Sequence, residues 1–133
     1  MRVFLDTNVL ISAFITRGLC ADIFRIILAE HHLVLSEYIL AEFEDVTRRK
    51  IDLPIEQIQS ILKYLRTFEI VQDHQPSESF EIRDNDDISV LAAALNGKCD
   101  ILISGDKDLL EINERYKIKI VDPRQFLQII KQK

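Results

Sequence analysis

The sequence predicts a three-layer α/β/α fold around a central five-stranded parallel sheet. Short apolar runs alternate with longer amphipathic segments, as expected for parallel strands joined by helical crossovers. The runs consist mainly of Val, Ile and Leu without polar alternation, which is typical of strands buried on both faces. The chain has 133 residues, of which 47% are hydrophobic and 29% charged, enough for one buried core. We therefore expect a single domain over residues 1–133.

The predicted strands share three features. Each is short, each is apolar, and each is bounded by polar or turn-forming residues. In chain order they are Arg2–Leu5, Leu33–Leu35, Glu69–Val71, Ile101–Ile103 and Ile118–Val121.

Two helices are predicted between the first and second strands. Thr7 or Asn8 can cap a short helix over Val9–Ile15, because both side chains can accept a hydrogen bond from free backbone N–H groups. A second helix over Cys20–Glu30 places its isoleucines on one face at helical spacing.

A helical hairpin is predicted after the second strand. Ser36 caps a helix that runs to about Lys50, and a second helix starts at Pro54, a residue favoured in the first turn. Because the connection is short, the two helices are expected to pack against each other. The polar segment 72–83 is predicted to be a loop.

Three further helices complete the alternation. Asn85–Asn96 has apolar residues at helical spacing, and Gly97 is expected to end it. A short helix over Asp108–Asn113 follows the fourth strand. Asp122 and the proline after it cap and open a last helix that reaches about Ile130.

Four acidic residues are expected to meet at one edge of this sheet. Asp6 and Asp106 follow strands, Glu42 lies on the helix after the second strand, and Asp87 lies at the start of an alanine-rich helix. Parallel strands end at a common edge, where open α/β sheets bind ligands. Converging carboxylates repel one another unless something neutralises them, and few basic residues lie beside these four. The hard, oxygen-preferring ions Mg²⁺ or Mn²⁺ are the expected ligand.

Each acid also has an ordinary structural interpretation. Asp6 could be a helix cap, although Thr7 and Asn8 can already fill that role. Glu42 lies within the apolar stripe of its helix, where an unpaired carboxylate is costly, and its alternative is an ion pair with Arg48 or Arg49.

The remaining acids are grouped in two short segments. Asp84 is the natural cap of the helix that follows it, Asp86 is expected to be solvated, and Asp87 is the best placed to point inward. Gly105 permits a tight turn before Asp106, and Asp108 is expected to cap the next helix. Asp84 and Asp108 are therefore additional candidate site acids.

The basic residues nearest the acids are candidates for contacting phosphate groups. They are Arg48, Arg49, Lys50 and Lys107, with ordinary solvated charges as the alternative. The net charge of −5 argues against nonspecific coating of nucleic acid but is compatible with a nuclease.

Cysteines and histidines show no metal-binding or catalytic spacing. Cys20 and Cys99 are expected to be free thiols, with a disulfide between them as the alternative. His31, His32 and His74 are expected at the surface. No apolar stretch is long enough to span a bilayer and no secretory signal is evident, so a cytoplasmic location is expected.

Four segments contain the candidate acids and follow one another in a fixed order along nearly the whole chain: Phe4–Leu10, Ser36–Glu42, Asp84–Leu95 and Ser104–Leu110. In this order they resemble the PIN domain family of metal-dependent ribonucleases, especially the small prokaryotic VapC-like toxins of toxin–antitoxin systems. Ser104 stands where many relatives have Thr.

This resemblance implies the sheet order 3-2-1-4-5 and an RNA-cleaving site that needs Mg²⁺ or Mn²⁺. Asp6, Glu42, Asp87 and Asp106 would be its catalytic and metal-binding acids, with Thr7, Asn8 and Ser104 as supporting polar residues. Asp6 and Asp106 are expected to be the primary ligands. The resemblance also implies an RNA substrate, an antitoxin protein as partner and a homodimer.

Other classes of protein fit the sequence less well. A haloacid-dehalogenase-like Mg²⁺ phosphohydrolase needs a second Asp two residues after the first, where this chain has Asn8. A phospho-receiver domain needs an acidic pair after the first strand and an acceptor Asp after the third, and the sequence shows neither. P-loop NTPases need a glycine-rich phosphate-binding loop, which the sequence also lacks. A non-enzymatic alternative is a metal-binding PIN fold that serves as an interaction module.

Overall fold

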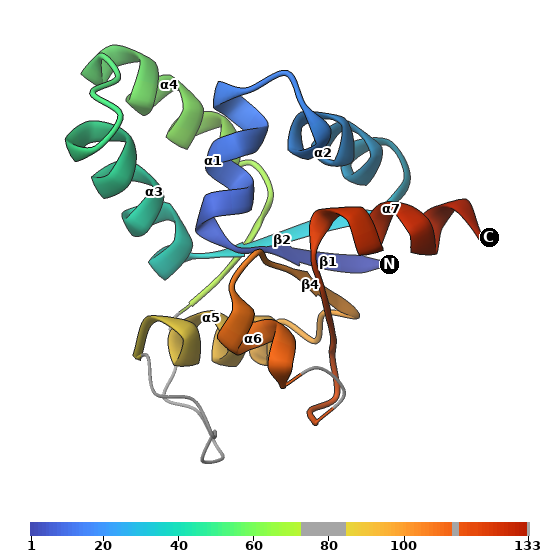
Figure 1. Ribbon diagram of the computed structural model, residues 1–133. Helices are drawn as coiled ribbons and strands as arrows, with labels where there is room; N and C mark the ends of the chain where they lie inside the picture. The colour runs from blue at the N-terminus through green and yellow to red at the C-terminus, as the bar shows by residue number, and fades with distance from the viewer. Residues whose placement is uncertain (73–84, 113–114, 133) are drawn as a thin grey trace.

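The computed structural model contains one five-stranded sheet, and it describes residues 1–72, 85–112 and 115–132 (Figure 1). All neighbouring strands are parallel, and their order is β3-β2-β1-β4-β5. The predicted α/β fold and the order 3-2-1-4-5 are therefore confirmed. The strands are β1 (Arg2–Leu5), β2 (His32–Ser36), β3 (Glu69–Val71), β4 (Ile101–Ile103) and β5 (Lys119–Val121).

Strand register places the polar residues that follow β1 and β4 side by side. Leu5 is opposite Ile103 in this ladder. The pairing continues one step beyond the strands, because the Asp6 N–H donates to the Ile103 carbonyl at 3.0 Å. The Ser104 N–H likewise donates to the Val121 carbonyl at 2.9 Å. These bonds fix the backbone at the carboxyl edge of the sheet.

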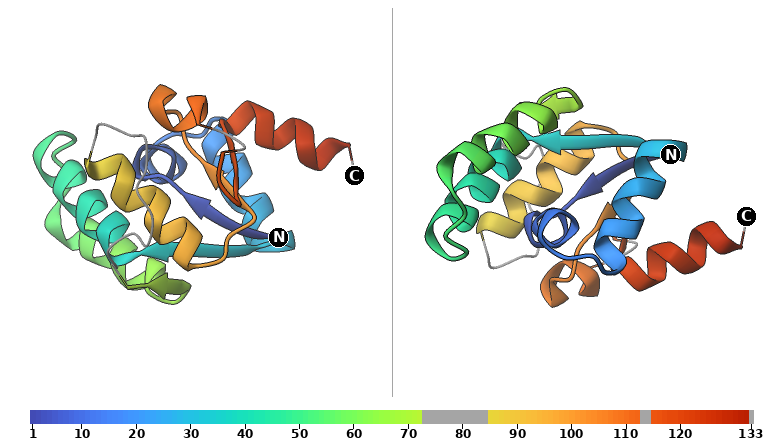
Figure 2. Two further views of the ribbon diagram at one scale, coloured as in Figure 1. Left: turned by 90° about the horizontal axis from the view of Figure 1, so that it is seen from below. Right: turned by 90° about the horizontal axis from the view of Figure 1, so that it is seen from above.

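Helices cover both faces of the sheet. In Figure 1, α1, α2 and α7 lie over one face and α5 and α6 over the other, while both termini lie away from the carboxyl edge. Figure 2 shows α3 and α4 side by side as the predicted hairpin. The helices are α1 (Thr7–Ile15), α2 (Leu19–Glu30), α3 (Glu37–Arg49), α4 (Ile55–Leu65), α5 (Asn85–Asn96), α6 (Lys107–Glu111) and α7 (Pro123–Lys131).

The core lies between the sheet and these helices. The central strands β1, β2 and β4 have buried apolar residues that face both helical layers, as their uninterrupted apolar sequences predicted. Large side chains from the helices complete it, including Phe43 of α3, Leu91 of α5 and Phe126 of α7.

Most predicted helix boundaries agree with the structure within two residues. Ser36 caps α3 by accepting from the Ile39 N–H at 3.1 Å, and Asp122 caps α7 in a reciprocal pair with Gln125. Pro54 is the residue before α4 and not its first residue. The predicted loop 72–83 falls outside the described residues except for Gln72.

Gly97 was expected to end α5, but it does not supply the left-handed residue at the helix end. The residue with left-handed backbone is Lys98 (φ 54°), and the N–H groups of Lys98 and Cys99 close the helix end on the Leu95 and Ala94 carbonyls. Gly97 is needed for packing, because a Cβ there would lie 3.2 Å from a Val34 methyl group.

The cysteines agree with the sequence-based expectation, whereas one of the histidines does not. Cys20 and Cys99 are free thiols, as expected. His32 is exposed, but His31 is half-buried, with its ring against Phe126, because it packs under α7. His74 lies outside the described residues. Within the described ranges, no helix is both long and apolar enough to cross a bilayer.

Candidate active site

Asp6 lies at the carboxyl end of β1 and also begins α1. Its backbone is extended, and its Oδ1 accepts a hydrogen bond from the Thr7 N–H at 2.7 Å. The prediction that Thr7 or Asn8 caps this helix is therefore wrong. β1 ends at Leu5 as predicted, but α1 begins two residues earlier than expected and already includes Thr7 and Asn8. The other carboxylate oxygen of Asp6, Oδ2, accepts a hydrogen bond from Ser104.

Ser104 connects the ends of β1 and β4 through its hydroxyl group. The hydroxyl donates to Asp6 Oδ2 at 2.6 Å and accepts from the Asp106 N–H at 3.0 Å. Ser104 is completely buried. One side chain thus fixes both the orientation of the Asp6 carboxylate and the path of the backbone into Asp106.

Three carboxylates from α5 and the start of α6 lie close together. Asp87, Asp106 and Asp108 each offer an oxygen within 4.8 Å of the other two, and Asp87 is 6% exposed. Asp106, not Asp108, caps α6, because Asp106 Oδ1 accepts from the Asp108 N–H at 2.8 Å. The turn begins directly after Gly105, which leaves the Asp108 side chain for the acidic group.

Glu42 is held by a tyrosine on its own helix. The Tyr38 hydroxyl donates to Glu42 Oε2 at 3.0 Å. The alternative of an ion pair with Arg48 or Arg49 is wrong, because Arg49 pairs with Asp45 on the outer side of α3 and Arg48 forms no ion pair with any described residue. Sequence reasoning did not select Tyr38, although its spacing four residues before Glu42 indicates a shared helix face.

Negative charge accumulates at this edge of the sheet. Burial raises the pKa of Asp6; the hydrogen bonds from Ser104 and Thr7 oppose this shift, and the charges of Glu42 and Asp106 add to it. Among described residues, no Lys, Arg or His forms an ion pair with Asp6, Glu42, Asp106 or Asp108. The site therefore has several carboxylate oxygens, and no cation from the part of the chain that the structure describes is bound to these four acids.

The other predicted site residues differ in their placement. Thr7 is buried and Asn8 is exposed, both in the first turn of α1. Asp86 is exposed, but its carboxylate also interacts with Tyr38, so it is not merely solvated. Asp84 lies outside the described residues. The candidate phosphate contacts, Arg48, Arg49, Lys50 and Lys107, are all exposed.

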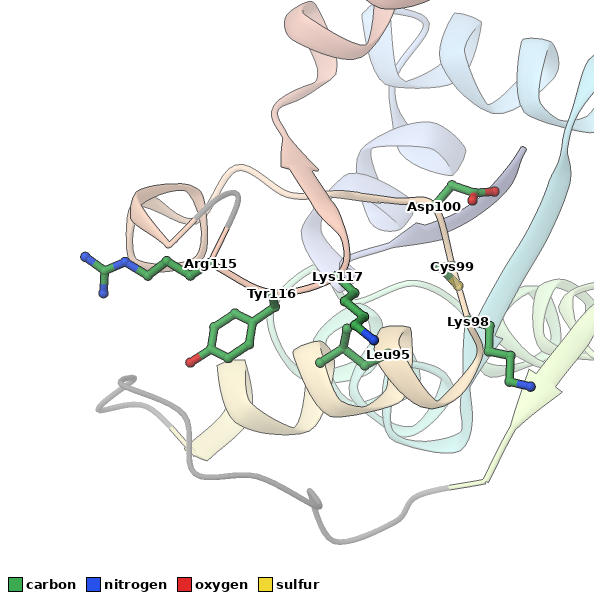
Figure 3. Close-up of a pocket in the computed structure, with 7 residues that line it drawn as sticks. All are labelled: Leu95, Lys98, Cys99, Asp100, Arg115, Tyr116 and Lys117. Carbon is green, nitrogen blue, oxygen red and sulfur yellow. The ribbon is translucent and has the colours of Figure 1, made fainter.

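A separate surface pocket of about 890 Å³ lies at the other end of α5 (Figure 3). Its lining includes Lys98, Arg115 and Lys117, and none of the site acids contributes to it. Figure 3 shows the Lys98 and Arg115 side chains pointing away from each other. The basic groups of this pocket therefore do not converge on one point and do not neutralise the acidic edge.

The comparison that decides the family is a match to the model described as PIN domain, which covers residues 2–108. The chain belongs to the PIN domain family. The match includes all four predicted catalytic acids of this PIN domain and most of its sheet. No curated protein matches the sequence.

Solved structures with the same fold include proteins of toxin–antitoxin systems. A toxin–antitoxin complex from Klebsiella pneumoniae has a TM-score of 0.66 at 21% identity, covering 91% of this chain and 97% of that one. VapBC-1 from nontypeable Haemophilus influenzae has a TM-score of 0.64 at 19% identity, covering 93% and 99%. VapC20 from Mycobacterium tuberculosis, described as a toxin that cleaves the sarcin–ricin loop, has a TM-score of 0.56 at 10% identity, covering 80% and 91%.

Proposed function

We propose that this PIN domain is an endoribonuclease that depends on Mg²⁺ or Mn²⁺. The observation that carries the proposal is the group formed by Asp87, Asp106 and Asp108, whose oxygens lie within 4.8 Å of one another. Hard divalent cations bind such carboxylate groups and retain water molecules as further ligands. The fit is chemical, since the donors are all oxygen and no basic residue pairs with Asp106 or Asp108 in the described ranges.

The acids of this chain would have different roles in binding the metal ion. Asp87, Asp106 and Asp108 are close enough to share one ion, while Asp6 and Glu42 lie beside them as further oxygen donors. The choice of Asp6 with Asp106 as primary ligands stays a prediction. A bound divalent ion would supply Lewis acidity toward a phosphodiester and its attacking water.

The residues around these acids would bind and orient the substrate. The net reaction consumes one water: its oxygen joins phosphorus, the bond from phosphorus to the leaving ribose oxygen breaks, and the protons of water end on the two products. Ser104 keeps Asp6 in one orientation, and exposed Lys107, next to Asp106, is the candidate for contacting a phosphate oxygen.

The proposed cellular role is that of a toxin restrained by an antitoxin protein. It is supported by the family match together with the fold shared with VapBC complexes. RNA as substrate is supported by the resemblance to a protein described as cleaving the sarcin–ricin loop. A homodimer also remains a prediction from the family resemblance.

Cleavage of labelled RNA by the purified protein tests the proposal. We expect cleavage in Mn²⁺ or Mg²⁺, none in excess chelator, and a loss of at least about 100-fold in Asp106→Asn, because removal of a ligand also disturbs its neighbours. Asp22→Asn is the matched control, since Asp22 pairs with Arg25 on exposed α2.

The result that would contradict the nuclease assignment is equally specific. Cleavage that persists in chelator, or that is equal in Asp106→Asn and Asp22→Asn, would point to a contaminating or metal-independent activity. Tight Mn²⁺ binding without cleavage of any RNA would instead favour an interaction module.

A further inference from the structure

Tyr38 connects two helices at the mouth of the acidic site. It is the second residue of α3, and its hydroxyl donates to Glu42 Oε2 at 3.0 Å, one turn along the same helix. The Asp86 carboxylate, in the first turn of α5, also forms a side-chain hydrogen bond with this hydroxyl. A phenol has a single proton, so one donor serves carboxylates from two different helices.

The ring and the hydroxyl of Tyr38 have separate roles. The ring is partly buried and packs against the hydrophobic core, which fixes where the hydroxyl can reach. The ordinary pKa of a phenol is about 10, so the Tyr38 hydroxyl is neutral at neutral pH and acts as a hydrogen-bond donor toward these carboxylates.

The contact with Asp86 determines where the next residue lies. Successive residues of a helix are rotated by about 100°, and Asp86 is exposed while Asp87 turns inward with 6% exposure. Asp87 is the member of the acidic group that comes from α5. A bond that fixes Asp86 against α3 consequently fixes Asp87 relative to Glu42.

We propose that Tyr38 is a positioning residue that joins α3 to α5 through Glu42 and Asp86 and thereby sets the arrangement of the acids. Its effect on metal binding rests on the proposed function. It acts by holding one oxygen of Glu42, leaving the other oxygen for the site, and by holding the first turn of α5 against α3. Removing only the hydroxyl should loosen this arrangement without disturbing the core.

Tyr38→Phe tests the proposal because it keeps the ring and removes the hydroxyl. Tyr64→Phe is the matched control: Tyr64 is 43% exposed on α4, and its ring contacts with Phe14 and Phe68 do not need its hydroxyl. Amide hydrogen exchange in the metal-free proteins reports the link between the helices. We expect faster exchange over Ser89–Leu91 in Tyr38→Phe than in wild type or Tyr64→Phe.

Calorimetric titration with Mn²⁺ provides the second readout. Loss of a group that orients metal ligands typically weakens metal affinity about 10-fold to 100-fold, and this is the shift expected for Tyr38→Phe alone. Asp86→Ala, at an exposed position where folding should be unaffected, removes both acceptor oxygens and is expected to accelerate the same amides.

Unchanged exchange over α5 in both Tyr38→Phe and Asp86→Ala would overturn the proposal. So would an unchanged Mn²⁺ affinity in Tyr38→Phe when the wild-type protein binds the ion. If the wild-type protein binds no Mn²⁺, the proposed function fails. Exchange in the metal-free proteins then still decides the role of Tyr38: faster exchange supports it, and equal exchange overturns it.

Discussion

Ser104 shows how much a single hydroxyl group contributes to the acidic edge. The hydroxyl donates to Asp6 Oδ2 and accepts from the Asp106 N–H. It is therefore satisfied both as a donor and as an acceptor, although Ser104 is fully buried. A buried polar group left without its partner typically costs about 1–3 kcal/mol. The sequence showed only that a hydroxyl residue follows β4, and the strand register explains why it is there.

Replacing Ser104 with alanine is expected to raise the pKa of Asp6 and to lower the free energy of unfolding by about 1–3 kcal/mol. Burial already raises this pKa, and the Ser104 hydrogen bond opposes the shift. Carboxyl ¹³C chemical shifts followed against pH measure the first effect, and urea unfolding measures the second.

Ser104→Thr is the control for that experiment, because it keeps the hydroxyl. We expect its Asp6 pKa to stay near that of the wild-type protein. An Asp6 pKa that is the same in the alanine variant as in wild type would show that the hydroxyl does not hold the carboxylate.

At the scale of elements, the sequence predicted which segments are helices and strands better than it predicted how they begin and end. Helical spacing identified α5, but the left-handed residue at its end is Lys98 and not Gly97. Gly97 is required by contacts with Val34 and Val71 from other strands, and such tertiary contacts leave no local pattern. The cap of α1 was misplaced for a related reason, since any of three consecutive polar residues could have served.

The edge strand β3 is joined to β1 and β2 by an ion-pair network at the amino end of the sheet. Glu69 accepts from the Arg2 guanidinium at 2.6 and 3.0 Å and lies 2.8 Å from His32 Nε2. The Arg2 guanidinium also donates to the Gly97 carbonyl at the end of α5. These bonds hold a three-residue strand that has few backbone partners of its own.

Acid should weaken this network in a defined pH range. The hydrogen bond from Arg2, followed by that from His32, lowers the pKa of Glu69 from 4.5 to about 2. A lowered folded-state pKa means that the carboxylate stabilises the fold above pH 4.5 and loses this contribution as the pH falls toward about 2. Glu69→Gln should therefore lose less stability over that interval than the wild-type protein, as measured by urea unfolding.

The matched control is Glu30→Gln. Glu30 is exposed at the end of α2 and forms no ion pair with another described residue. The free energy of unfolding of Glu30→Gln should change with pH as it does in the wild-type protein. Equal pH dependence in Glu69→Gln and wild type would show that solvent screening removes the contribution of the network.

At the scale of the whole molecule, the sheet topology brings residues that are distant in sequence together at one site. The predicted alternation of strands and helices was sufficient to place Asp6 and Asp106 at the same sheet edge, and the register of β1 with β4 confirms that placement. Asp108 was only an additional candidate acid in the sequence, where it was expected to cap the following helix; Asp106 is the cap, and the Asp108 carboxylate lies with those of Asp87 and Asp106. The sequence did not predict Tyr38, whose importance arises from packing between α3 and α5.

The acidic edge is also what distinguishes this PIN domain from a purely structural α/β domain. Carboxylates at strand ends often serve only as caps, and Asp6 and Asp106 do cap helices. Each carboxylate oxygen keeps a lone pair beyond its hydrogen bond, and no protein cation in the described ranges pairs with either carboxylate. An arrangement of this kind is electrostatically unfavourable unless protons or a cation neutralise it, and under the proposed function a divalent cation does so.

The position of Mn²⁺ in crystals soaked with the ion tests this account most directly. Anomalous scattering is predicted to show a peak in contact with the carboxylates of Asp87, Asp106 and Asp108, and the peak should be absent in crystals of Asp106→Asn. Crystals of the wild-type protein with no peak at these carboxylates, or with Mn²⁺ bound only elsewhere on the surface, would contradict the claim that this acidic edge is a metal-dependent active site.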